Sequence, residues 1–207
     1  MGLLALYRLA FGCWEMRLVA TLTLLAAGLV ATSQGPAAQL MLATLCGALG
    51  WGAGEYLFHR FVLHLPRPKA QWLQRIHAML HWQHHQEPDD PRRLFIPVPG
   101  IVNLFALWGA IGYAAFGAAA GAGAALGLGA MLLFYETTHL AAHVSYRPRT
   151  RWGQAMKRSH RLHHYKNERY WFGVTHPFMD RLAGTWPAHD GVAKSETARS
   201  LGVDSGT

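Results

Sequence analysis

Charged residues are scarce in this 207-residue sequence, and that scarcity narrows the class of protein. Only 14% of the residues are charged and 51% are hydrophobic, whereas about 25% of a soluble domain is charged. No charged residue occurs from Leu18 to Gly54 or from Leu94 to Tyr135. The net charge of +8 comes from basic residues that flank these apolar stretches. This distribution argues against a nucleic-acid surface and favours a membrane protein.

Cysteine is also rare, which argues against a disulfide framework. The two cysteines, Cys13 and Cys46, are far apart and lack the spacing of a metal site. We interpret them as small buried hydrophobic residues. A cleavable leader is not expected either, because the apolar residues 1–10 run into Glu15 and Arg17 without a small-residue cleavage pattern.

Each charge-free stretch is long enough for two membrane spans, since about 20 residues of helix cross a hydrocarbon core of roughly 30 Å. Residues 33–36 end in proline and break the first stretch, and the glycine-rich residues 117–123 loosen the second. We therefore predict an all-α integral membrane fold with four transmembrane helices in two hairpins. The expected helices are residues 16–33, 37–58, 100–118 and 122–142.

The basic residues predict the orientation of these helices. Arg and Lys lie before the first span and after the second and fourth, and neither hairpin tip carries one. By the positive-inside rule, both termini and the central segment are expected in the cytoplasm, where a helical cap would hold a di-metal site. The expected location is the inner membrane of a bacterium or the endoplasmic reticulum of a eukaryote.

The length fits one domain, which we place at residues 1–187. From residue 188 on, the sequence loses aromatic residues and gains Ser, Thr, Gly and Asp. We expect residues 188–207 to form a mobile C-terminal tail.

Histidine, in contrast, is abundant and ordered. Ten of the thirteen histidines form two pairs and two clusters, and the order pair, spacer, cluster occurs twice with sixteen residues in each spacer. In chain order these groups are His59 and His64; His81, His84 and His85; His139 and His143; and His160, His163 and His164.

Helical spacing gives these groups chemical meaning, because residues three and four apart share a face. We expect each cluster to aim its three imidazoles at one place, and His139 and His143 to do the same. His59 and His64 lie five apart, about 140° around an ideal helix. They would serve two neighbouring metals or lie where the helix end distorts.

Neutral imidazole binds iron, zinc, copper and nickel, and ten ligands exceed what one ion accepts. We therefore predict two ions with about five histidines each. His77 lies one turn before His81 and is a lesser candidate; His176 and His189 lack partner spacing and are expected to be structural or exposed. Glu55 and Glu136 precede ligand histidines at span ends, and we expect their carboxylates to accept ring N–H groups.

Four segments resemble the histidine boxes of the fatty acid hydroxylase superfamily, which are membrane di-iron enzymes, and most closely its fatty acid 2-hydroxylase branch. They are EYLFHRFVLH at 55–64, HAMLHWQHH at 77–85, YETTHLAAH at 135–143, and HRLHHYKN at 160–167 followed by FGVT at 172–175. The resemblance covers roughly residues 51–186. Unlike the eukaryotic members, this sequence shows no haem-binding cytochrome domain before the boxes, and Ser159 and His176 stand where other residues are expected.

The resemblance implies an O2-dependent oxidoreductase that hydroxylates a lipid acyl chain, with position 2 as the expected carbon. Two iron ions would be held by the ten histidines, a separate electron-donor protein would supply electrons, and no catalytic residue beyond the ligands is expected. Zinc would compete for these nitrogen sites in purified protein. Alternatives within the superfamily are carotenoid, sterol or ornithine-lipid hydroxylases. A metal-ion transporter would place its ligands near the middle of the bilayer, and a haem-binding bundle would place paired histidines inside the spans.

Overall fold

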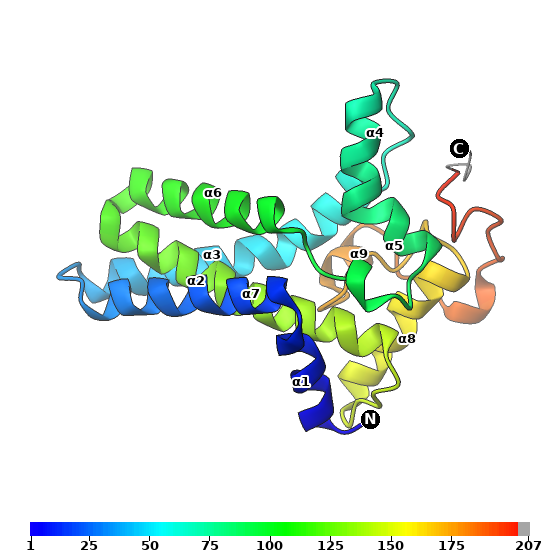
Figure 1. The fold of residues 1–207 in the computed structure, drawn as a ribbon, viewed down its shortest axis with the longest axis horizontal. Helices are drawn as coiled ribbons and strands as arrows, with labels where there is room; N and C mark the ends of the chain where they lie inside the picture. The colour runs from blue at the N-terminus through cyan, green and yellow to red at the C-terminus, as the bar shows by residue number, and fades with distance from the viewer. Residues whose placement is uncertain (203–207) are drawn as a thin grey trace. The chain divides into compact units, whose positions relative to one another are not determined.

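A computed structural model describes residues 1–202 and contains only helices, turns and loops over that range. The chain divides into two compact units (Figure 1). We call residues 7–53 and 96–136 the apolar unit. The histidine unit contains residues 1–6, residues 54–95 and the chain from Thr137 onward. Each is described by itself below.

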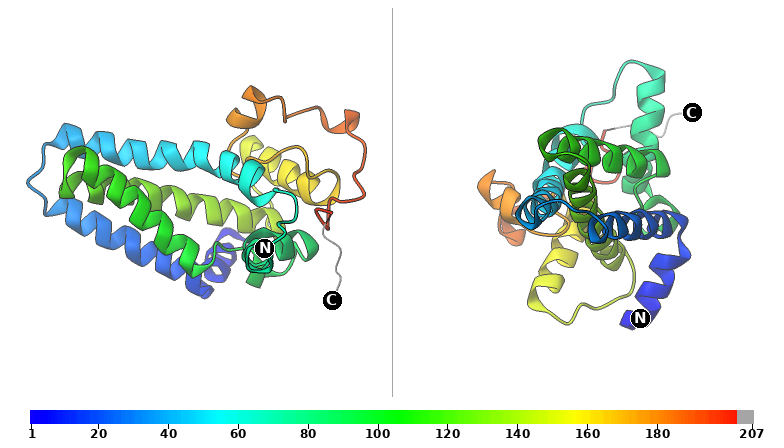
Figure 2. Two further views of the ribbon diagram at one scale, coloured as in Figure 1. Left: turned by 90° about the horizontal axis from the view of Figure 1, so that it is seen from above. Right: turned by 90° about the vertical axis from the view of Figure 1, so that its left-hand side faces the viewer.

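Four long helices build the apolar unit, and the two views of Figure 2 show them side by side. They are α2 (Trp14–Ala31), the first part of α3 (Ala37–Phe58), α6 (Val98–Phe116) and most of α7 (Ala118–His143). A shorter helix, α1 (Leu3–Gly12), precedes α2. All four long helices have the length and apolarity to cross a membrane, as predicted, and the chain is a multi-pass membrane protein.

The break between the last two spans is shorter than the sequence indicated. Only Gly117 leaves the helix, with φ of 82°, and α7 starts at Ala118. A positive φ is the conformation that glycine adopts without strain. The neighbouring alanines and glycines continue the helix, so the tight turn needs one special residue instead of seven.

Small residues let α3 and α7 approach closely in the apolar unit. A Cβ added at Gly127 would overlap the carbonyl of Thr44, and one at Gly47 would overlap the carbonyl of Ala124. Close backbone contact of this kind drives association of helices in lipid, where the hydrophobic effect between helices is weak.

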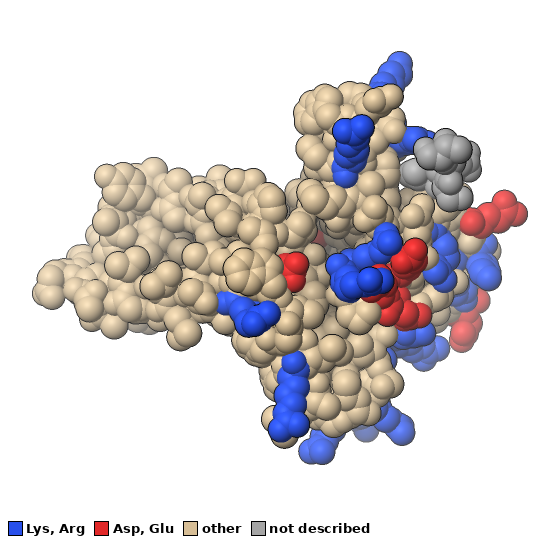
Figure 3. All heavy atoms as spheres, viewed as in Figure 1, with Lys and Arg blue, Asp and Glu red and all other residues tan. Residues whose placement is uncertain are grey.

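Larger side chains form a hydrophobic core in this unit. Val19, Trp51, Ile101, Leu128 and Leu132 are buried together. Many large apolar side chains instead point outward, as lipid-facing residues do, and they include Leu24 and Leu49 at 72% and 71% exposure. The face of these helices seen in Figure 3 is accordingly almost free of charge.

Short helices build the histidine unit, two of them π-helices. After α3, whose last residues belong here, come η1 (His59–Leu63, π), α4 (Gln71–His77), η2 (Ala78–Trp82, π), α5 (Gln83–Gln86) and η3 (Pro91–Arg93, 3-10). The end of α7 is followed by α8 (Arg151–Tyr165), α9 (Phe178–Leu182) and η4 (His189–Gly191, 3-10). Thr150 caps α8 by accepting a hydrogen bond from the Gly153 N–H at 3.1 Å.

A lysine of α8 ties that helix to the end of α7. The Lys157 ammonium donates to the carbonyls of Ala141, Val144 and Tyr146 at 2.7, 2.5 and 2.9 Å. The last carbonyls of a helix lack partners within it, so a cation there supplies both donors and a favourable charge. Lys157 therefore fixes the end of α7, where His139 and His143 lie.

The structure describes residues 188–202 of the expected tail, and part of this segment contacts the chain that follows α8. Within residues 188–202, Val192 and Ala198 are buried at 9% and 3% exposure, and the Ser195 N–H donates to the Lys166 carbonyl at 2.7 Å. Composition indicated a solvated chain because most side chains here are small and polar, and the mobility of this segment stays a prediction. Residues 203–207 of the expected tail lie outside the described residues.

Candidate metal centre

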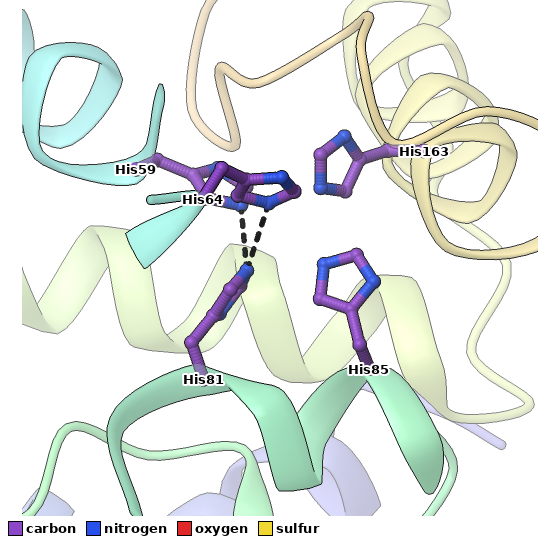
Figure 4. A group of neighbouring side chains, drawn as sticks. All are labelled: His59, His64, His81, His85 and His163. Atoms are coloured by element: carbon purple, nitrogen blue, oxygen red, sulfur yellow. Dashed lines mark hydrogen bonds between the residues drawn. The ribbon is translucent and has the colours of Figure 1, made fainter. Parts of the chain in front are cut away.

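The ten histidines predicted as ligands come together in the histidine unit as two groups of five. Within each group one nitrogen per ring lies within 4.8 Å of those of the other four, so each group could hold a metal ion. Group A, drawn in Figure 4, contains His59, His64, His81, His85 and His163. Group B contains His84, His139, His143, His160 and His164. Apart from the partly buried His64, all are buried.

A π-helix explains how His59 and His64 join the same group. In η1 the helix widens, and the His64 N–H donates to the His59 carbonyl at 3.2 Å, a bond between residues five apart. Residues five apart then lie closer to one face than in an ideal α-helix, where they are about 140° apart. Their ring centroids are 4.9 Å apart. Of the two arrangements expected, the distorted helix end is the one found.

The prediction that each three-histidine cluster points at one place is wrong. His81 and His85 belong to group A while His84 between them belongs to group B; in the same way His160 and His164 belong to group B and His163 to group A. Residues four apart are offset by only about 40° around a helix, whereas neighbouring residues are about 100° apart. The i,i+4 pair therefore shares a site, and the third histidine turns to the other.

The two groups are direct neighbours. Rings of different groups approach to 4.2 Å between the centroids of His85 and His164, and 5.9 Å between those of His81 and His84. Imidazole rings of the two groups are therefore in direct contact.

The spacing of ring nitrogens fits metal ligation. In group A the His81 Nε2 lies 3.1 Å from the Nε2 atoms of both His59 and His64. In group B the corresponding His143–His160 and His160–His164 distances are 2.8 and 3.1 Å. Adjacent ligands bound at about 2.1 Å from an ion lie ~3 Å apart at right angles.

Two further group A rings present a free nitrogen to the same place. The Nε2 atoms of His85 and His163 are buried without a hydrogen-bond partner in the described part of the chain. A buried polar atom is costly without a partner, and a cation would provide one. The residues present thus fit a metal ion at each group.

Backbone carbonyls set the tautomer of three group A histidines. The Nδ1 atoms of His59, His163 and His85 lie 2.6, 2.7 and 2.8 Å from the carbonyl oxygens of Phe172, Tyr170 and Ala198. A carbonyl only accepts, so each Nδ1 carries the proton and each Nε2 keeps its lone pair for a metal.

Two of these carbonyls flank a strained residue. Trp171 is fully buried and has φ of 58°, a left-handed conformation that is unusual for a bulky side chain. The Trp171 N–H donates a hydrogen bond to the Thr185 carbonyl at 2.9 Å. The turn at Trp171 sets the directions of the carbonyls on either side of it, which accept hydrogen bonds from His163 and His59.

Two buried carboxylates hold the loop at residues 170–175, which includes the turn at Trp171, in place. Glu55 accepts from the N–H groups of Val174 and Thr175 at 3.2 and 3.0 Å, and from the Thr175 hydroxyl at 2.9 Å. Asp180 accepts from the N–H groups of Phe172 and Gly173 at 3.0 and 2.7 Å.

The roles expected of the two glutamates therefore change. Glu55 acts on His59 through the loop, and the ring N–H goes to a carbonyl instead of to the carboxylate. In the apolar unit, Glu136 accepts from the Ile96 N–H at 2.9 Å. From the sequence, residues 172–175 stand out only as part of a resemblance, because backbone acceptors leave no trace in side-chain identity.

Burial keeps these imidazoles neutral. Desolvation lowers the pKa of His85 to about 3, even though the bond to Ala198 acts in the opposite direction. Desolvation, followed by repulsion from neighbouring histidines, also holds the pKa values of His81, His84, His160 and His164 well below the usual 6.5. A neutral ring is the form that binds a metal.

The remaining three histidines lie outside both groups. The His77 ring packs 5.3 Å from the Trp82 ring centroid, and the His189 ring 5.5 Å from that of Trp171. His176 is buried. The lesser candidate His77 is therefore a packing residue beside the site.

The architecture defines a class: a helical multi-pass membrane protein whose span ends and short helices gather two adjacent five-histidine groups. The family model for fatty acid hydroxylase matches residues 44–185, and the chain belongs to that family.

Named relatives and a solved structure agree with this assignment. The sequence is 32% identical over 160 residues to the dihydroceramide fatty acyl 2-hydroxylase FAH2 of Arabidopsis thaliana, covering 75% of this chain and 65% of the relative. It is 31% identical to the human fatty acid 2-hydroxylase over 66% of this chain and 37% of the human protein.

A solved structure described as full-length scs7p, with only the hydroxylase domain visible, matches with a TM-score of 0.71 and 26% identity. The match covers 86% of this chain and 66% of that one. The chain therefore spans at most about two thirds of the relatives compared here.

Proposed function

We propose that this chain is a membrane hydroxylase that introduces a hydroxyl group at position 2 of a lipid acyl chain, with O2 as co-substrate. The observation that carries the proposal is the pair of adjacent five-histidine groups in a chain of the fatty acid hydroxylase family. Two relatives support the substrate class, because one is named a dihydroceramide fatty acyl 2-hydroxylase and the other a fatty acid 2-hydroxylase.

The ten histidines of groups A and B are proposed as the ligands of two iron ions. Bound iron would supply the activation of dioxygen, a chemistry for which side chains alone are unsuited. The chain supplies the rest: lone pairs of fixed direction, neutral rings, and a buried environment that excludes bulk water. No further side chain is proposed as an acid or base.

The position of the site in the chain favours a carbon close to the lipid head group. His59 follows α3 directly, and His143 is the last residue of α7, so two of the four spans lead into the histidine groups. An acyl chain anchored by its head group at the membrane surface would offer its first carbons there, and its tail would stay in the apolar region. Position 2 is therefore favoured over positions deep in the acyl chain.

Orientation and partners belong to the same proposal. Both hairpins are proposed to enter the membrane from the cytoplasm. Lys and Arg lie before the first span and after the second and fourth spans, and they are absent from the connections within the hairpins at residues 32–36 and 117. A separate electron-donor protein is proposed to reach the centre from the cytoplasmic side, since hydroxylation with O2 consumes two electrons that the histidines do not supply.

Lipid analysis tests the function. The chain is expressed in a host that lacks 2-hydroxy acyl lipids, and the extracted lipids are compared by mass spectrometry with those from cells carrying His163→Ala. New 2-hydroxy acyl species only with the unaltered chain are expected. Hydroxylated carotenoids, sterols or ornithine lipids in their place would contradict the proposed substrate, and metal uptake into the cell without any new lipid would indicate a transporter.

A further inference from the structure

Residues 192–199 contact the C-terminal ends of two helices that carry histidines, α5 and α8, and we call them the C-terminal strap. Val192 and Ala198 of the strap are buried, whereas Lys194 and Glu196 are exposed. The strap belongs to the histidine unit, as do α5 and α8, which it joins.

One end of the strap is fastened to the chain that follows α8. The Ser195 N–H donates to the carbonyl of Lys166, directly after the last residue of the helix. The hydroxyls of Ser195 and Thr197 donate to the Glu168 carboxylate at 3.1 and 2.7 Å. Glu168 is itself buried at 6% exposure, so these are strong, charge-assisted contacts.

The other end is fastened to α5 by a single arginine. The Arg199 Nε donates to the His85 carbonyl at 3.0 Å, and a terminal nitrogen donates to the Gln86 carbonyl. These are the last carbonyls of α5, which the helix itself leaves without partners. The Arg199 guanidinium also lies 5.2 Å from the ring centroid of Tyr165, the last residue of α8.

Between these two attachments the strap meets a group A ligand. The Ala198 carbonyl accepts the hydrogen bond from His85 Nδ1 at 2.8 Å, and the His85 side chain is fully buried. This bond leaves Nε2 as the nitrogen that faces group A and stops rotation of the ring. Group B differs: the Nδ1 atoms of His84, His160 and His164 are buried without a partner among the described residues.

We propose that the C-terminal strap positions His85 for metal binding and thereby controls how firmly group A retains its ion, with Arg199 as the positioning residue that fastens it. The inference rests on the proposed function in that each group holds a metal. It goes beyond that function by assigning a role to a segment outside the histidine boxes. Removing an outer partner of a ligand histidine lowers metal affinity by roughly 10- to 100-fold.

Metal retention tests the inference without any assay of activity. The full chain and its Arg199→Ala variant are purified in detergent, loaded with cobalt(II) and exposed to excess chelator. The fast and slow phases of metal loss are followed by visible absorption and by elemental analysis. We expect the unaltered chain to lose both ions slowly, and Arg199→Ala to lose one of two ions at least about tenfold faster while keeping the other.

Three further variants give the controls. Arg199→Lys, which retains a donor for the same carbonyls, should restore part of the slow phase. Lys194→Ala removes an exposed charge of the same strap and should behave as the unaltered chain. Thr197→Val, nearly the same shape, loosens the Glu168 attachment and should accelerate the same phase, so the test survives if Arg199→Ala does not fold.

The outcomes separate the two proposals. If Arg199→Ala and Thr197→Val keep both ions at the unaltered rate, the strap does not position His85. If the two ions leave Arg199→Ala equally fast together with a lower unfolding temperature, Arg199 has only a structural role and the inference fails. If the unaltered chain itself binds fewer than two cobalt ions, the proposed metal centre is wrong.

Discussion

At the scale of single residues, neighbours in the sequence have separate partners in space. His84 and His85 are adjacent in α5, yet one faces group B and the other group A. The i,i+4 periodicity predicts which histidines share a helix face, but it does not say which of two neighbouring groups the odd member of a cluster joins. That assignment depends on where the opposite helix places its own rings.

This separation leads to a prediction for the pair. Substituting either His84→Ala or His85→Ala should lower bound metal from two ions toward one per chain, because each removes a ligand from a different group. Hydroxylation should fall by at least about 100-fold in both, since ligand loss exceeds the effect of losing an outer partner. Elemental analysis and lipid mass spectrometry measure the two effects.

The control for this pair is His77→Ala, which removes a buried histidine that lies outside both groups. It should retain two ions. A His84→Ala, His85→Ala double variant that still binds one full ion would contradict the division of ligands between groups.

Glu55 offers a second prediction at this scale, because its contact with His59 is indirect and runs through the backbone of the loop at residues 170–175. Glu55→Ala would leave the N–H groups of Val174 and Thr175 buried without an acceptor. Each such group costs about 1–3 kcal/mol, so we expect a clear fall in the unfolding temperature in detergent. We also expect about tenfold weaker metal retention, since the loop carries the Phe172 carbonyl that accepts the His59 N–H.

Glu55→Gln separates this arrangement from direct contact between the carboxylate and His59. Glutamine retains an acceptor oxygen for the two N–H groups, so most of the stability and metal retention should remain. Equal losses in the Ala and Gln variants would show that the negative charge, and not the bonds to the loop, is what matters.

At the scale of elements, the spans were predictable and the special helices were not. Charge-free length and a proline locate four helices to within a few residues, because bilayer thickness and helix rise leave little freedom. The π-helices η1 and η2 have no such signal. In η1 the wider turn brings His59 and His64 toward one face, whereas an ideal α-helix would place them about 140° apart.

The close approach of α3 and α7 gives a prediction about an element pair. Gly127→Ala should destabilise the folded protein by more than about 2 kcal/mol, because the new methyl group meets the Thr44 backbone carbonyl, which has no rotamer to move to. Thermal unfolding in detergent measures this effect.

Gly28→Ala in α2 is the matched control, because a Cβ there meets nothing within 4 Å. Alanine is the better helix former by roughly 1 kcal/mol, so this variant should be neutral or slightly more stable. Equal behaviour of the two variants would mean that α3 and α7 do not pack as described.

At the scale of the whole molecule, the chain buries an unusual number of titratable rings in one unit. The number and order of the histidines predicted a shared site, whereas the loop at residues 170–175 and the C-terminal strap could not be read from composition. Both act through backbone carbonyls, whose direction depends on the folded path of the chain. The sequence thus indicates which histidines gather better than it indicates what orients them.

The buried rings also make stability depend on pH in a definite direction. Burial lowers the pKa of His85 to about 3 and also holds those of His81, His84, His160 and His164 well below their ordinary range. In the unfolded chain these rings take up protons below about pH 6.5, while in the folded, metal-free protein they do not. Stability is therefore fully present above about pH 6.5 and is lost as the pH falls toward 3.

The expected result is a steep fall in the unfolding temperature of metal-free protein between pH 7 and pH 5, with little change between pH 7 and pH 8. Uptake of only two protons on unfolding gives a slope of about 2.7 kcal/mol per pH unit. Protein loaded with cobalt(II) should show its fall at lower pH, because a proton must then displace a metal ion to bind the same nitrogen. An unfolding temperature of metal-free protein that stays level down to pH 5 would contradict the burial of the rings in one shared site.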